Sequence, residues 1–133
     1  MQFIRKYPFL PAVIFFFITV FLLTLPGSSF PKSHFFNIPY FDKWVHIGLF
    51  GTLCFLFSYP IISSAISIKQ KRIWFVAIFL LCSIYGVAME YVQEYWVINR
   101  SFDEMDMLAD SIGSLVAMFI SFQLLHKYNK SRV

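Results

Sequence analysis

The chain has 133 residues, of which 59% are hydrophobic and 14% are charged, whereas soluble domains average about 45–50% apolar and about 25% charged residues. This composition excludes an ordinary soluble domain, and the length allows a single domain in a membrane. The net charge of +4 does not indicate a nucleic-acid partner, because the basic residues gather at the ends of apolar segments, where they set membrane topology.

Four apolar segments predict an all-α, polytopic membrane protein with four transmembrane helices and the lipid bilayer as its partner. We expect the helices over residues 8–25, 44–62, 73–95 and 105–125. A helix needs about 20 residues to cross a bilayer, and the charge-free parts of the last two segments are shorter than that. The third helix must therefore continue past Glu90 and the fourth must begin near Met105, which draws acidic residues into the outer boundary of the membrane.

The first segment admits two interpretations. Arg5 and Lys6, an apolar run and then Pro26-Gly27 resemble a signal peptide. No clear A-x-A cleavage site follows and the run is long, so we expect an uncleaved span. The loop after it, residues 26–43, is rich in aromatic residues, including Phe30, Phe35 and Phe36. We expect this loop to lie at the membrane interface.

The distribution of charge gives the orientation. The N-terminal tail, the loop between the second and third helices and the C-terminal tail carry only bases: Arg5, Lys6, Lys69, Lys71, Arg72, Lys127, Lys130 and Arg132. By the positive-inside rule, this side and both termini face the cytoplasm. The other side carries Lys32, Lys43, Arg100 and all seven acids: Asp42, Glu90, Glu94, Asp103, Glu104, Asp106 and Asp110. Any chemistry is therefore expected at the extracytoplasmic surface.

The first polar cluster on that side is Asp42-Lys43-x-x-His46. Asp42 and His46 are four residues apart and share a helix face. Asp42 is placed to cap the second helix. An imidazole gains little from facing lipid, so we expect His46 to point inward to a partner; the alternative is a simple interfacial residue.

The second cluster is Glu90-x-x-Gln93-Glu94, whose spacing places all three side chains on one helix face. Glu90 is the deepest acid and needs a partner or a task at that depth. It either forms a structural ion pair between helices or serves as a proton-transfer, metal or ligand-binding group.

The third cluster begins at Arg100 and surrounds the start of the fourth helix. Ser101 or Asp103 can cap that helix, whereas Asp106 and Asp110 lie one turn apart on its face. Gly113 follows on the same face and can permit close packing against another helix. Arg100 can neutralise Glu90 or Asp106, or bind an anionic headgroup or substrate.

In this order the three clusters resemble the VanZ-like family of small bacterial membrane proteins. The family's D-K-x-x-H matches Asp42, Lys43 and His46; its E-x-x-Q matches Glu90 and Gln93; and its R-S-F-x-x-x-D-x-x-x-N-x-x-G matches Arg100, Ser101, Phe102, Asp106 and Gly113. Asp110 stands where the family has Asn, which favours a cation-binding or proton-sharing site. The resemblance implies a single VanZ-like domain over residues 1–133 in a bacterial cytoplasmic membrane. It also implies a link to the cell envelope and to glycopeptide-antibiotic resistance, the phenotype associated with the family's namesake.

Three classes of function fit this pattern. In the first, a site binds a lipid-linked or cell-wall ligand, with Lys43 and Arg100 engaging its anionic groups; its lining is Lys43, His46, Glu90, Gln93, Arg100, Asp106 and Asp110. In the second, a membrane-embedded hydrolase or transferase uses Glu90 as general acid or base, with His46 and Asp106 as further catalytic candidates. A divalent metal held by His46, Glu90, Asp106 and Asp110 is a variant of this reading. In the third, the same residues form a structural polar network without catalysis, or an ion path.

Overall fold

The computed structural model describes residues 6–26 and 40–131, which form four α-helices and no strand within those ranges. The helices are α2 (Leu10–Leu23), α3 (Phe41–Ile62), α4 (Ile68–Trp96) and α5 (Glu104–Lys130). The expected all-α class with four helices is confirmed. Several residues named in the sequence predictions lie outside the described residues, in the loop after the first apolar segment and at the two termini: Phe30, Lys32, Phe35, Phe36, Arg5 and Arg132.

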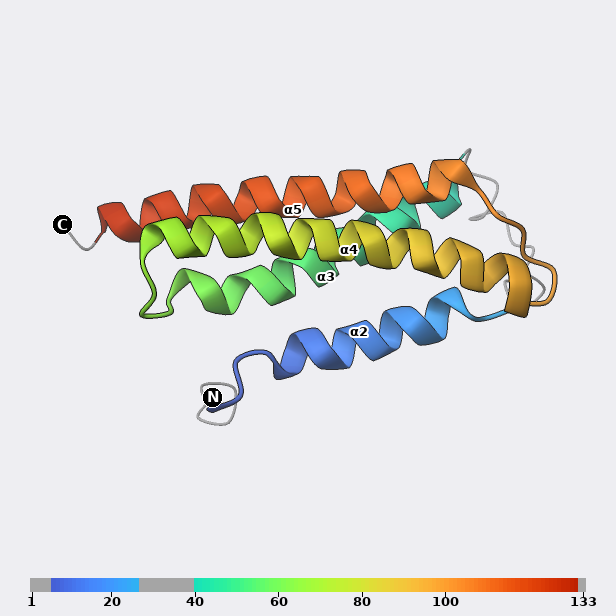
Figure 1. The fold of residues 1–133 in the computed structure, drawn as a ribbon, viewed down its shortest axis with the longest axis horizontal. Coiled ribbons are helices and arrows are strands. Elements are labelled where there is room, and N and C mark those ends of the chain that lie inside the picture. The colour runs from blue at the N-terminus through green and yellow to red at the C-terminus, as the bar shows by residue number, and fades with distance from the viewer. Residues whose placement is uncertain (1–5, 27–39, 132–133) are drawn as a thin grey trace.

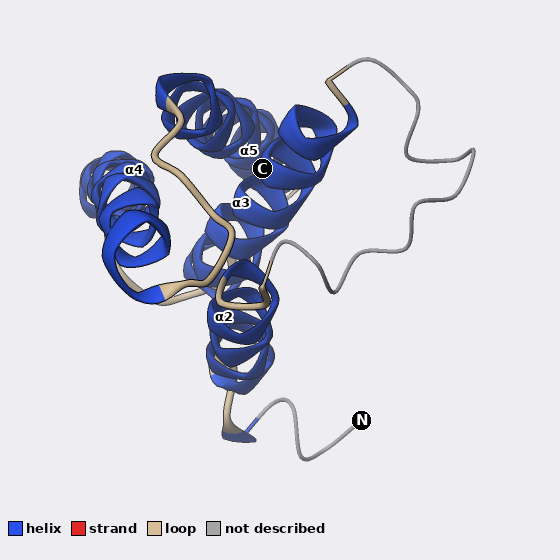
Figure 2. Cartoon of the chain, turned by 90° about the vertical axis from the view of Figure 1, so that its right-hand side faces the viewer, coloured by secondary structure: helices blue, strands red, loops and turns tan. Residues whose placement is uncertain are grey.

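The helices α3, α4 and α5 form a bundle, and α2 packs on α3 and α4 at its side (Figures 1 and 2). The start of α2, the α3–α4 turn and the end of α5 lie at one end of the bundle. The end of α2, the start of α3 and the α4–α5 connection lie at the other (Figure 1). This arrangement brings the three polar clusters of the sequence to the same end.

Three helices are long and apolar enough to cross a membrane: α3 with 22 residues, α4 with 29 and α5 with 27. The fourth, α2, has only 14 residues, or about 21 Å at 1.5 Å per residue, and is shorter than the expected 8–25. Large apolar side chains on the outside of the bundle, such as Phe17 and Ile84, are 64% exposed. A surface of this kind suits lipid, and the protein is an integral membrane protein.

Three of the helices are longer than the sequence predicted, and α3 begins at Phe41 rather than residue 44. The start of α4 lies at Ile68 rather than residue 73, because Ser67 and Gln70 form a capping box in which each side chain bonds the other's backbone N–H. The end of α5 lies at Lys130 rather than residue 125, and Lys127 and Lys130 in its last turn suit the helix dipole.

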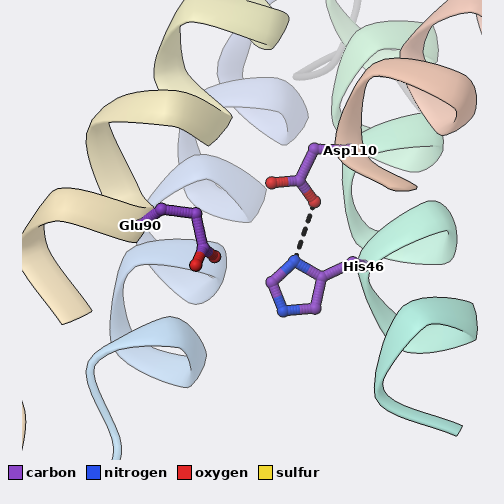
Figure 3. Close-up of side chains that lie close together, drawn as sticks. All are labelled: His46, Glu90 and Asp110. Atoms are coloured by element: carbon purple, nitrogen blue, oxygen red, sulfur yellow. Dashed lines mark hydrogen bonds and ion pairs between the residues drawn. The ribbon is translucent and has the colours of Figure 1, made fainter. Parts of the chain in front are cut away.

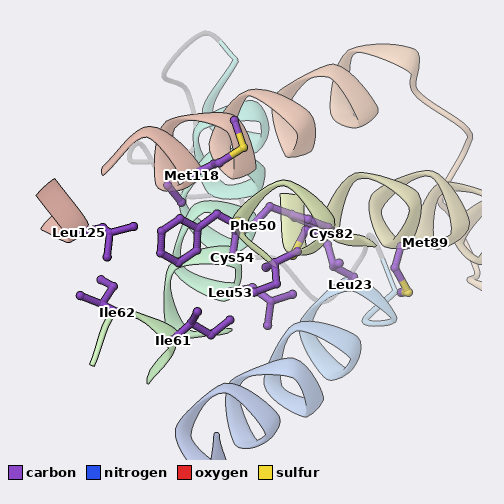
Figure 4. Packing of buried hydrophobic residues seen from close by; sticks show 13 residues of the cluster. Leu23, Phe50, Leu53, Cys54, Ile61, Ile62, Cys82, Met89, Met118 and Leu125 are labelled. Carbon is purple, nitrogen blue, oxygen red and sulfur yellow. The ribbon is translucent and has the colours of Figure 1, made fainter. Parts of the chain in front are cut away.

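The core lies between the helices and extends from Ile62 and Leu125 at one end of the bundle to Leu23 and Met89 beside the polar clusters (Figure 4). Phe50 and Phe75 are fully buried there. Cys54 and Cys82 are buried in the same core as free thiols. Thr19 of α2 lies 3.1 Å from the Tyr85 hydroxyl of α4, and this polar contact anchors α2 to the bundle.

The closest approach of two helix backbones is between α3 and α5 at Gly113. A Cβ atom built on Gly113 would lie 2.3 Å from the backbone oxygen of Ile47 and 2.9 Å from its Cα. Gly51, one turn along α3, faces the same glycine, with 3.2 Å between its own built Cβ and the Gly113 oxygen. Only residues without a side chain allow this approach, so Gly113 sets the spacing of the two helices.

Replacing Gly113 with alanine should therefore destabilise the bundle, by about 1–3 kcal/mol, the usual effect of overpacking. Gly48 is the matched control, because nothing lies within 4 Å of a Cβ built there, and Gly48→Ala should be neutral or slightly stabilising through helix propensity. Thermal unfolding of both variants in detergent measures the difference. Equal midpoints for Gly113→Ala and the wild type would show that the helices do not touch at this point.

Candidate functional site

The candidate site is a polar cluster in which α3, α4 and α5 each contribute one buried side chain. His46 comes from the second turn of α3, Glu90 from the last third of α4 and Asp110 from the second turn of α5. Figure 3 shows the Glu90 and Asp110 carboxyl groups turned towards the His46 ring. Glu90 and Asp110 have no exposed surface, and His46 is 3% exposed.

His46 is held between two carboxylates of α5. Its Nδ1 lies 2.8 Å from Asp110 Oδ1, and its Nε2 lies 3.7 Å from Asp106 Oδ2. Asp106 and Asp110 are four residues apart, so both face α3 from consecutive turns. The inner face of the ring stacks parallel to Phe50 at 6.4 Å between centroids. The structure thus places His46 inward and gives it polar partners.

Lys43 lies one turn nearer the helix start and is surrounded by acids. Its Nζ lies 2.8 Å from Asp42 Oδ2 and 2.6 Å from Asp106 Oδ1, and it also bonds Asp103. The Lys43 ammonium holds the pKa of the Asp103 carboxyl below its usual value. Lys43 therefore neutralises Asp42, Asp103 and Asp106, which together form the rim of the cluster. Among the described residues, Asp106 forms ion pairs with Lys43 and His46.

The expectation that Asp42 caps α3 is wrong. The cap position is Tyr40, whose backbone is left-handed with φ of 60° and whose side chain makes no capping bond. Because α3 begins at Phe41, earlier than expected, Asp42 lies inside the first turn and bonds Lys43 instead. Its charge still suits the positive end of the helix dipole.

Two glutamates of α4 hold the connection that leads to α5. Glu90 Oε2 accepts the backbone N–H of Asp103 at 3.0 Å, and Glu94 Oε2 accepts that of Phe102 at 2.7 Å. Asp103 in turn caps α5 by accepting the Met105 N–H at 2.8 Å. Of the two expected caps, Asp103 fills the role, whereas Ser101 lies outside the helix and is exposed.

Gln93 and Arg100 lie away from the imidazole. The buried Gln93 side chain donates its amide N–H to the Leu23 carbonyl at 3.0 Å, which ties the end of α2 to α4. This bond uses Gln93 for structure rather than for a ligand. Arg100 is half-buried on the α4–α5 connection, where its backbone N–H donates to the Val97 carbonyl at 3.4 Å.

Two oxygens in the cluster have no hydrogen-bond partner within the described part of the chain: Glu90 Oε1 and Asp110 Oδ2, both buried. Gly86 of α4 makes the room for Asp110, since a Cβ built there would lie 2.7 Å from Asp110 Oδ2. Carboxylate oxygens only accept hydrogen bonds or coordinate cations. The cluster therefore suits a proton, a hydrogen-bond donor or a cation, and does not suit a bare anion.

Sequence reasoning missed the role of Gly86 and the triple contact of Lys43. Gly86 lies four residues before Glu90, so the same helical spacing that grouped Glu90 with Gln93 also marks Gly86 as part of this face. The contacts of Lys43 with Asp103 and Asp106 join residues 60 or more positions apart, and only the packing of α3 on α5 reveals them. No protein-family model, no curated protein and no solved structure matches the chain.

Replacing Lys43 with methionine should destabilise the protein, because the change leaves three carboxylates facing one another without their cation. We expect a loss of about 2 kcal/mol, which is below the roughly 3–5 kcal/mol for breaking a fully buried ion pair, since Asp42 and Asp103 remain partly exposed. Lys69→Met, an exposed lysine of α4, is the control and should have little effect. Thermal unfolding in detergent measures the stability of both variants. Equal midpoints for Lys43→Met and Lys69→Met would contradict the assigned role of Lys43.

Proposed function

We propose that this protein binds a lipid-linked or cell-wall ligand at the extracytoplasmic surface of a bacterial cytoplasmic membrane, through the cluster of His46, Glu90 and Asp110. The observation that carries the proposal is the pair of buried carboxylate oxygens without a partner, Glu90 Oε1 and Asp110 Oδ2, beside a buried imidazole. Glu90 and Asp110 lie on α4 and α5, which are both long and apolar enough to span a membrane.

A purely structural network accounts less well for these oxygens. Leaving a buried acceptor unsatisfied costs about 1–3 kcal/mol, and ionised carboxylates near lipid cost more. The rim around Lys43 behaves as a structural network should, because its acids share one cation. Glu90 and Asp110 each have one oxygen without a hydrogen-bond partner, which favours a ligand that supplies a hydrogen-bond donor or a positive charge.

The resemblance to the VanZ-like family supports the envelope as the source of the ligand. The residues that carry the resemblance, among them Lys43, His46, Glu90 and Asp106, are those that gather at this end of the bundle. On this reading the chain is a single VanZ-like domain, and the resemblance extends the proposal to glycopeptide tolerance. Asp110, in place of the family's Asn, makes the cluster more acidic in this chain.

The geometry changes the expected mode of recognition. Lys43 was expected to bind anionic groups, but its contacts with three carboxylates commit it to the protein. The ligand group that enters the cluster must then be a hydrogen-bond donor or carry positive charge.

The proposal requires the polar end of the bundle to face outward, and cysteine labelling tests this directly. Ser101 and Ala65 are both exposed and lie at opposite ends, whereas native Cys54 and Cys82 are buried. A membrane-impermeant maleimide added to intact cells should label Ser101→Cys and should reach Ala65→Cys only after lysis. The reverse pattern would place the cluster in the cytoplasm and end the proposal.

Ligand binding tests the proposal itself. The protein is reconstituted in lipid nanodiscs and titrated with a polyprenyl-diphosphate-linked cell-wall precursor. Glu90→Gln keeps the shape of the side chain and an acceptor for the Asp103 N–H, but it removes the charge. We expect it to weaken binding at least about tenfold, as the loss of one charge-assisted hydrogen bond does.

The matched control is Glu104→Gln, an exposed acid in the first turn of α5, which should bind as the wild type does. Far-UV circular dichroism checks that the variants keep their helices. Equal affinity of Glu90→Gln and the wild type, or no binding by the wild type, would count against the proposed function.

A further inference from the structure

The cluster carries two acidic groups whose surroundings differ. Asp42, Asp103 and Asp106 offer carboxylate oxygens close to one another, but Lys43 bonds all three and supplies their positive charge. His46, Glu90 and Asp110 form the second group, and no lysine or arginine is among the ion pairs of its acids in the described chain. The Lys43 ammonium neutralises the first group, whereas no ammonium neutralises Glu90 and Asp110 among the described residues.

The second group has the geometry of a ligand set. One ring nitrogen of His46 and one carboxylate oxygen each of Glu90 and Asp110 lie within 4.8 Å of one another. The three side chains come from three different helices and converge on one point (Figure 3). All three are buried, so packing rather than solvent fixes their directions.

An independent observation points to a ligand in this position. Glu90 and Asp110 are fully buried, and each directs one oxygen, Oε1 or Oδ2, that finds no partner. Glu90 uses its other oxygen on the Asp103 N–H, and Asp110 uses its other oxygen on the imidazole. Each residue is thus oriented through one oxygen and keeps the second available, which is the usual arrangement of a ligating carboxylate.

We infer that His46, Glu90 and Asp110 bind a divalent metal ion that accepts both imidazole and carboxylate ligands, Zn²⁺ or Mn²⁺. Two carboxylates and a neutral imidazole carry two negative charges, which one dication neutralises. Asp106 Oδ2 lies 3.7 Å from His46 Nε2, too far for a hydrogen bond, and Asp106 lies outside this set. Gly86 is part of the site, because any larger residue there would push into Asp110.

The metal would also explain how an acidic cluster serves a lipid-linked ligand that carries phosphate. Three protein ligands leave coordination positions free on such an ion, and metal ions held by carboxylates commonly take substrate phosphate oxygens in those positions. This second step rests on the proposed function, whereas metal binding itself does not. The bound ion turns a site that repels anions into one that accepts them.

The first test is metal binding by the full chain, purified in detergent, stripped with a chelator and titrated with Mn²⁺ and Zn²⁺ by calorimetry. We expect one ion per chain and a higher thermal unfolding midpoint with metal present. His46→Gln and Asp110→Asn should each weaken binding at least about tenfold, and His126→Gln, an exposed histidine at the other end of α5, should not.

Glu90→Gln provides a third ligand variant in case one of the first two does not fold, and circular dichroism of the metal-free proteins decides which are compared. No stoichiometric binding by the wild type would overturn the inference. Unchanged metal affinity in folded variants of His46 or Asp110 would also overturn it, because the ion would then bind elsewhere. A stability that depends on pH but does not change when metal is added would overturn it as well, because the cluster would then hold a shared proton in place of a metal.

A second titration separates this inference from the proposed function. The polyprenyl-diphosphate precursor is added to the wild type in nanodiscs, with Mn²⁺ or with chelator. Binding only with metal supports both. Equal binding without metal overturns the phosphate-bridging step and leaves the proposed function standing. Stoichiometric metal binding without any precursor binding leaves the metal site standing and removes the proposed function.

Discussion

The approach of α3 to α5 at Gly113 is the constraint on which the polar cluster depends. Gly113 meets the backbone of Ile47 so closely that a Cβ would lie 2.3 Å from its oxygen. His46 precedes Ile47, and Asp110 lies one turn before Gly113 on the same face of α5. The contact of glycine and backbone therefore places the imidazole within hydrogen-bonding distance of the Asp110 carboxylate. Gly86 does the same for α4 by making room for Asp110.

The acidic residues at this end of the bundle fall into two groups, which differ in how their negative charge is neutralised. Lys43 gathers three carboxylates at the rim, and the contacts are local to the starts of α3 and α5. The buried part has His46 and two carboxylates, each with one oxygen in use and one in reserve. A low-dielectric surrounding makes an unmatched charge expensive, so the buried part is where a ligand, a metal or a proton contributes most. The acids around Lys43 thus stabilise the fold, whereas the neighbouring His46, Glu90 and Asp110 are the proposed ligand-binding residues.

Much of this arrangement could be predicted from helical periodicity, which tells which residues share a face. Length and apolarity predicted four helices, and the shortness of the last two segments predicted that the third helix continues past Glu90 and that the fourth begins near Met105, as α4 and α5 do. Periodicity does not give the rotation of one helix against another, so it could not show that Lys43 contacts Asp106 or that Gln93 bonds the end of α2. Asp42 was misplaced because α3 begins at Phe41, after a left-handed Tyr40 that the sequence does not mark, so that Asp42 lies inside the first turn.

The central claim is that His46, Glu90 and Asp110 converge on one point as a ligand set. An experimental structure of the Mn²⁺-soaked protein, with anomalous scattering measured at the manganese edge, tests it most directly. We expect a single anomalous peak bounded by the imidazole and the two carboxylates, with His46 moved little from its place against Phe50. A peak among Asp42, Asp103 and Asp106, or no peak with Glu90 and His46 turned apart, would contradict it.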